Sequence, residues 1–153
     1  MANVNYPSSG RYRRPRPVTR CGLATVEAAL IFPLLLVLTL GVIEYGWMFL
    51  KQQQITNAAR QGARLAATPL TGNAALSAEV NTLMTEAGLA GKYQLTTVPA
   101  VISAVTPGST FTVTITVDYS DVTITHMSDP DNMIHLPAPA NLRAVVAMAK
   151  EGP

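Results

Sequence analysis

Residues 28–43 (AALIFPLLLVLTLGVI) carry no charge and are almost all apolar, and this run restricts the fold more than any other feature of the chain. The wider window 23–50 is interrupted by only two charged residues, Glu27 and Glu44. A helix of about 20 apolar residues crosses a bilayer core. A buried helix of a soluble domain is the alternative, but the apolar residues at 34–38 leave no polar face. We therefore predict a transmembrane helix over 23–50.

Positive charge is concentrated before this run. Residues 1–22 contain five arginines and no acidic residue, whereas Lys51 is the only base close to the other end. The positive-inside rule therefore predicts a basic cytoplasmic leader (1–22) and an extracytoplasmic C-terminal part. A cleaved secretory signal is the competing interpretation, but no small-residue cleavage pattern follows the apolar run.

The charge of the remaining chain argues against nucleic-acid binding. The formal net charge is +2, from 11 basic and 9 acidic residues. Without the five leader arginines, residues 23–153 hold 6 basic and 9 acidic residues, a net charge of −3. A nucleic-acid-binding domain would spread positive charge over its folded surface. The single cysteine, Cys21, excludes an internal disulfide and says little about the compartment.

Glu27 is the most informative residue, because it stands at the start of the apolar segment. A carboxylate at the edge of the hydrocarbon costs several kcal/mol without a cationic partner, and residues 23–43 contain no cation. Cleavage after Gly22 would create an α-amino group on Leu23, four residues before Glu27. That amine could pair with Glu27 of the same chain or of a neighbouring subunit. The alternative is that Glu27 merely extends to the lipid headgroups.

Three segments in order resemble the TadE-like pseudopilin family. They are residues 22–36 (GLATVEAALIFPLLL), 41–46 (GVIEYG) and 58–64 (AARQGAR). The resemblance implies a minor pilin-like subunit of a tight-adherence (Flp-type) pilus and secretion system. By the same analogy, a prepilin peptidase removes residues 1–22 by cutting between Gly22 and Leu23, and Glu27 serves assembly. Major pilins of this type carry tyrosine after the glutamate, and Ala28 stands there instead, which favours an accessory subunit.

Residues 51–67 (KQQQITNAARQGARLAA) predict a continuation of the same helix outside the membrane. Ala58 and Gly62 belong to a strip of small side chains at a spacing of four, on which another backbone could rest. Arg60 and Arg64 are also four apart and project from one side. These four residues are candidates for helix packing or partner contact, and the alternative is a solvated face with headgroup contacts.

The sequence after the long helix predicts a small α+β head over 68–153. Residues 68–73 (TPLTGN) break the helix, and apolar residues between 76 and 89 fit one face of a shorter helix. Apolar residues alternate with threonine over 111–117, which predicts an antiparallel strand with one buried face. The alternation resumes in the opposite phase at 122–125, so 119–121 marks a turn or bulge. Residues 106–109 predict a turn, and 141–150 can be read as strand or as helix.

The whole chain is therefore predicted to have a pilin-like α+β fold. It consists of a long N-terminal transmembrane helix that continues outside the membrane, a short helix and a small antiparallel sheet. The expected partners are the inner membrane, the prepilin peptidase, other pilin-like subunits and the pilus assembly platform.

One cluster in the head carries possible metal ligands. His126, Asp129, Asp131 and His135 lie close together in the segment THMSDPDNMIH. Imidazole and carboxylate groups bind divalent metals, but Ser-Asp-Pro-Asp-Asn is also typical of a turn, which is the favoured interpretation. No phosphate loop, dinucleotide fingerprint or nucleophile elbow occurs, so we expect neither an enzyme nor a cofactor or small-molecule substrate.

A second hypothesis keeps the leader in place. The chain would then be an uncleaved single-pass protein whose exported head is a binding module. A threonine-rich sheet and a short acidic loop suit this function equally well.

Overall fold

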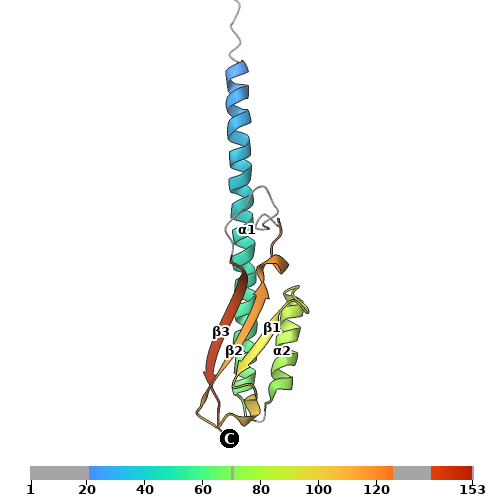
Figure 1. The fold of residues 1–153 in the computed structure, drawn as a ribbon, viewed down its shortest axis with the longest axis vertical. Helices are drawn as coiled ribbons and strands as arrows, with labels where there is room; N and C mark the ends of the chain where they lie inside the picture. Colours follow the sequence, from blue (N-terminus) through green and yellow to red (C-terminus); the bar gives the residue numbers. More distant parts are fainter. Residues whose placement is uncertain (1–20, 70, 126–138, 153) are drawn as a thin grey trace, which may run out of the picture. The chain divides into compact units, whose positions relative to one another are not determined.

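A computed structural model describes residues 21–69, 71–125 and 139–152 (Figure 1). The chain forms two compact units, residues 1–36 and residues 37–153. The first unit contributes the N-terminal part of helix α1 (Cys21–Ala67), and the second contains the rest of α1 and the head. The predicted α+β class is confirmed, because a long apolar helix, a short helix and an antiparallel sheet are all present.

Helix α1 is continuous over 21–67 and contains Pro33. It ends where Thr68 and Pro69 follow, as the sequence predicts, because the residue before a proline disfavours helical torsion angles. In the second unit the C-terminal half of α1 contributes a row of alanines and one isoleucine to the hydrophobic core. The buried residues are Ile55, Ala58, Ala59, Ala63, Ala66 and Ala67. Small side chains on this face let the rest of the head approach the helix closely.

Helix α2 (Asn73–Glu86) buries Leu76, Val80 and Met84, and the first two lie next to Gly62 of α1. Ala87 is its C-cap, and Gly88 follows in the left-handed region with φ +74°, where glycine has no steric cost. The amide of Leu89 donates to the carbonyl of Met84 and closes the turn. The predicted short helix is therefore confirmed.

The sheet has three antiparallel strands in the order β1 (Gln94–Val98), β2 (Thr110–Asp118) and β3 (Asn141–Ala149). The central strand β2 buries Phe111, Val113, Ile115 and Val117 against the helices and presents threonine on the other face. Figure 1 shows the three strands alongside the C-terminal half of α1. Residues 141–149 form a strand, so the helical alternative for this segment is excluded.

Turns join these strands much as predicted, with one difference. Ser109 donates to Thr106 across the 106–109 turn, and Gly108 has φ +82°. A 3-10 turn, η2 (Tyr119–Asp121), ends β2, as the change of phase predicts, and another, η1 (Ile102–Ala104), follows β1. The expected second run of strand at 122–125 is wrong. These residues form no strand because their polar groups turn instead toward a carboxylate of α1.

Candidate functional site

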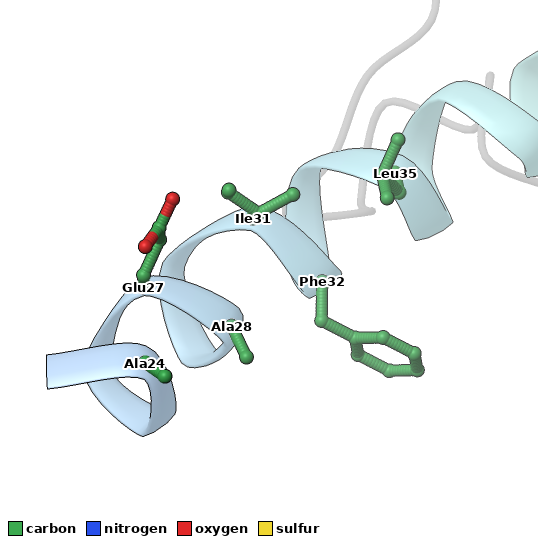
Figure 2. Close-up of a pocket in the computed structure, with 6 residues that line it drawn as sticks. All are labelled: Ala24, Glu27, Ala28, Ile31, Phe32 and Leu35. Carbon is green, nitrogen blue, oxygen red and sulfur yellow. The ribbon is translucent and has the colours of Figure 1, made fainter. Parts of the chain in front are cut away.

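The first unit presents one apolar face with a carboxylate at its N-terminal end. Six residues spaced along α1 line a shallow hollow of about 340 Å³: Ala24, Glu27, Ala28, Ile31, Phe32 and Leu35 (Figure 2). Their spacing of three and four places them on one side of a helix. Leu30, Phe32 and Leu34 are largely exposed, by 79%, 66% and 69%. This part of α1 offers an apolar surface that a lipid or a second helix can cover.

Glu27 is exposed, and no cation of the described residues pairs with it. Over 21–69, 71–125 and 139–152, the ion pair present joins Lys92 to Asp121 at 3.5 Å. The predicted cationic partner of Glu27, the α-amino group of a cleaved Leu23, does not exist in the uncleaved chain. Pairing of Glu27 with that amine therefore stays a prediction.

The predicted cleavage site lies in the first turn of α1. Gly22 and Leu23 are both helical, and Gly22 is exposed with nothing within 4 Å of the position of a Cβ atom. The first turn of a helix lacks part of its hydrogen bonding and opens at low cost. An enzyme that needs an extended substrate would have to unwind only this turn.

The second unit contains a buried carboxylate that sequence reasoning recognised only as an acidic position. Glu44 of α1 is 3% exposed. Its Oε1 accepts hydrogen bonds from the Tyr119 hydroxyl (3.1 Å), the Thr123 hydroxyl and the Ile124 amide (3.3 Å). Its Oε2 accepts from the amide (3.0 Å) and the hydroxyl (2.8 Å) of Thr125. We call Glu44 and these donors the Glu44 clamp.

Every donor in the Glu44 clamp is neutral. A buried carboxylate is normally paired with a cation or satisfied by several hydrogen bonds, and among the described residues the partners of Glu44 are hydrogen-bond donors. The donors come from residues 75 to 81 positions further along the chain, just after β2. The clamp therefore fastens the end of the sheet to α1 near the N-terminal end of the second unit.

The charge of Glu44 also acts on Tyr119. Burial, together with the neighbouring carboxylate, raises the pKa of Tyr119 to about 12. The hydroxyl of Tyr119 therefore keeps its proton at physiological pH and remains a donor to Glu44.

Trp47 and Lys51 continue the same face of α1. The indole N–H of Trp47 donates to the Val122 carbonyl at 2.9 Å. The ammonium of Lys51 lies 4.7 Å from the centre of the Trp47 ring and donates to the carbonyl of Ala87, which ends α2. The orphan carbonyls at a helix C-terminus favour such a cation. Glu44 and Trp47 thus bind the loop after β2, and Lys51 binds the C-terminal end of α2.

The strip of small residues on α1 contacts its own chain. Ala58 and Gly62 are buried, and a Cβ atom at Gly62 would lie 2.6 Å from Val80 and 2.8 Å from Leu76. The close approach thus joins α1 to α2 of the same chain. Arg60 and Arg64 are exposed on α1 and point away from this contact. A role of these arginines in partner contact stays a prediction.

The candidate metal ligands His126, Asp129, Asp131 and His135 lie outside the described residues. Within the residues that the structure does describe, no group of three or more histidine, cysteine, aspartate or glutamate side chains is placed to hold a metal ion.

Residues 22–64 match the model of a protein family described as TadE-like protein. The match covers all three segments on which the resemblance rests, so the TadE-like assignment is confirmed for this part of the chain. No curated protein and no solved structure matches the chain. The matched segment contains Glu27, Glu44 and Gly62 but none of the strands. The TadE-like segment relates the protein to the tight-adherence pilus, and α1 is long and apolar enough to cross a membrane.

Proposed function

We propose that this protein is a minor, pilin-like subunit of a tight-adherence pilus or secretion system, anchored in the bacterial inner membrane by α1. The observation that carries the proposal is the exposed Glu27 at the start of an exposed apolar helix face, within the TadE-like segment. The arginine-rich residues 1–22 favour a cytoplasmic N-terminus and an extracytoplasmic head. Other pilin-like subunits and the assembly platform are the partners that this face would meet.

Processing by a prepilin peptidase between Gly22 and Leu23 belongs to the same proposal. The cut would remove the leader and leave the new amine of Leu23 one helical turn from Glu27. Residues four apart on a helix are neighbours, so the two charges can pair at the membrane edge, within one chain or between subunits. Pairing offsets the cost of placing the carboxylate there.

The Glu44 clamp supports a shorter span than the sequence suggests. A carboxylate covered by threonines and backbone amides of the head belongs to the head, so we place the end of the span before Glu44. Residues 23–43 form a helix about 32 Å long, close to the thickness of a hydrocarbon core. The remainder of α1, including Trp47 and Lys51, then belongs to the extracytoplasmic unit.

The mass of the mature protein tests processing directly. We expect protein from the native host to begin at Leu23 when the assembly genes are expressed. The Glu27→Gln variant should still insert into the membrane but enter assemblies at a much reduced level. Glu86→Gln, which changes an exposed carboxylate of α2, serves as the matched control and should assemble normally.

The same experiment addresses the anchored binding module. Full-length chains that begin at Met1 in assembling cells, together with normal assembly of Glu27→Gln, would exclude the pilin-like function and favour that alternative.

A further inference from the structure

Helix α1 has two different faces between residues 42 and 51, within the second unit. One face binds the head through Glu44, Trp47 and Lys51. The opposite face exposes large apolar side chains: Val42 by 66%, Ile43 by 50%, Phe49 by 61% and Leu50 by 45%. We call these four residues the outer apolar face. Single exposed apolar residues are ordinary, but a contiguous group of this size marks an interaction surface.

Along α1, the change from apolar to polar residues occurs at different positions on the two faces. On the head side, polar contacts begin at Glu44. On the outer side, apolar residues continue to Leu50, and the exposed residues after it are polar. These are Gln53, Asn57, Arg60, Gln61 and Arg64. The outer apolar face therefore extends six residues beyond Glu44, a rise of about 9 Å.

The head exposes a further apolar residue at the level of Glu44. The side chain of Ile124 is 49% exposed, while its amide donates to Glu44 Oε1 at 3.3 Å. Ile124 therefore belongs to the Glu44 clamp, on the opposite side of α1 from the outer apolar face. Apolar side chains thus surround α1 on both sides where polar contacts begin.

We propose that Phe49, Leu50 and Ile124 lie in the interfacial layer of the membrane that α1 crosses, in contact with lipid headgroups and the adjoining acyl chains, while Val42 and Ile43 reach the edge of the hydrocarbon core. This inference rests on the proposed function, because it requires α1 to span the membrane. The interfacial layer is about 5–8 Å thick in each leaflet, and apolar faces bury about 5–10 Å into its boundary. A rise of about 9 Å fits that depth.

Lipid is a better occupant of this face than the helix of a second copy. Contacts between helices in membranes are rich in small residues that let backbones approach. Here the bulky Ile43, Phe49 and Leu50 surround a single small residue, Gly46, whose surroundings are open. Aromatic and branched side chains of this size suit the disordered boundary of a bilayer. The Glu44 clamp would then hold the head directly against the membrane surface.

Spin labels in the full chain test this depth. On a Cys21→Ser background, single cysteines replace Leu38, Phe49 or Asn57 and receive a nitroxide label. The labelled proteins are placed in vesicles of phosphatidylcholine and phosphatidylglycerol. Collisions with oxygen and with a water-soluble nickel complex are then measured by electron paramagnetic resonance. We expect about fivefold fewer nickel collisions at position 49 than at position 57, and fewest at position 38.

Each outcome separates the two proposals. Equal nickel accessibility at positions 49 and 57, with position 38 protected, would overturn the interfacial contact and leave the span intact. High nickel accessibility at position 38 would overturn the span itself. Protection of position 49 from both oxygen and nickel, lost when the protein is diluted in lipid, would assign the face to a second copy instead. Oxygen access at position 49 that is independent of dilution supports lipid contact.

Discussion

Both carboxylate oxygens of Glu44 accept hydrogen bonds from hydroxyl groups and backbone amides of the head. The Glu44→Gln substitution turns one acceptor oxygen into a donor that faces a backbone amide of Ile124 or Thr125. We therefore expect a loss of about 1–3 kcal/mol in the free energy of unfolding of the head. Urea denaturation of the full chain in detergent micelles, followed by far-UV circular dichroism, measures the change. Glu86→Gln is the control and should stay within about 0.5 kcal/mol. An unchanged Glu44→Gln midpoint would contradict the clamp.

The hydroxyl of Tyr119 should titrate late. Burial and the charge of Glu44 raise the pKa of Tyr119 to about 12 in the folded protein, against about 10 in an unfolded chain. The folded state then binds its proton more tightly. The resulting stabilisation is complete below pH 10 and is lost as the pH rises through about 12. In a pH titration, tyrosinate absorbance should show a step near pH 12 that disappears in Tyr119→Phe. A late step that survives this substitution would assign it to another tyrosine.

Contacts between elements depend on a second buried lysine. Lys150, which directly follows β3, donates to the carbonyls of Ala66 (2.8 Å), Thr68 (2.8 Å) and Thr71 (3.3 Å) where α1 ends. Its side chain thus satisfies helix-terminal carbonyls and ties the sheet to α1.

We expect Lys150→Met to lower the free energy of unfolding by about 1–3 kcal/mol, because these buried acceptors lose their donor. Lys92→Met is a matched control, since Lys92 is 51% exposed and makes a surface ion pair with Asp121. It should cost less than about 1 kcal/mol. Equal losses in the two variants, measured by thermal unfolding, would refute a special role for Lys150.

The packing of α2 on α1 makes Gly62 sensitive to one methyl group. In an open helix, replacing glycine by alanine stabilises by about 1 kcal/mol. At Gly62 the added carbon would lie 2.6 Å from Val80 and 2.8 Å from Leu76, so the two helices would have to separate. We expect Gly62→Ala to destabilise by about 1–3 kcal/mol. Gly46→Ala, on the same helix with open surroundings, should be neutral or stabilising. An unfolding midpoint that is higher for Gly62→Ala than for Gly46→Ala would show that the contact between α1 and α2 accommodates the added methyl group.

For the molecule as a whole, the elements were predictable because local patterns determine them. The alternation over Phe111–Val117 and the glycines after α2 act within a few residues, and β2 and the helix stop follow from them. The sequence left open whether 141–149 forms a strand or a helix, because the strand depends on pairing with β2, which is distant in the sequence.

The Glu44 clamp was not predictable, because its donors lie 75 to 81 residues away in sequence. Thr123 and Thr125 fit the alternating pattern of a strand, but in the structure their hydroxyls donate hydrogen bonds to Glu44. A glutamate inside an apolar helix, read together with a polar cluster after a strand, was the available signal. Sequence separation also concealed the roles of Lys51 and Lys150 as donors to helix ends, since Lys51 is 36 residues from Ala87 and Lys150 is 84 residues from Ala66.

The position of the clamp makes a prediction about where the head begins. Composition alone places the end of the apolar segment at residue 50, yet Glu44 and Trp47 bind the loop after β2. A fragment of residues 51–153 lacks both groups, whereas 37–153 and 42–153 retain them. In the same detergent, we expect 51–153 to be less stable than 37–153 by about 3–5 kcal/mol or to remain unfolded, since five hydrogen bonds to one carboxylate disappear together.

The intermediate fragment separates the clamp from the length of the helix. The fragment 42–153 lacks residues 37–41 (VLTLG) but keeps Glu44 and all its donors, so it should match 37–153 in thermal unfolding followed by circular dichroism. A steady decline of stability from 37–153 through 42–153 to 51–153 would instead mean that helix length stabilises the head. If only the last truncation unfolds the head, the structural boundary lies at Glu44, because the head closes on α1 through that carboxylate.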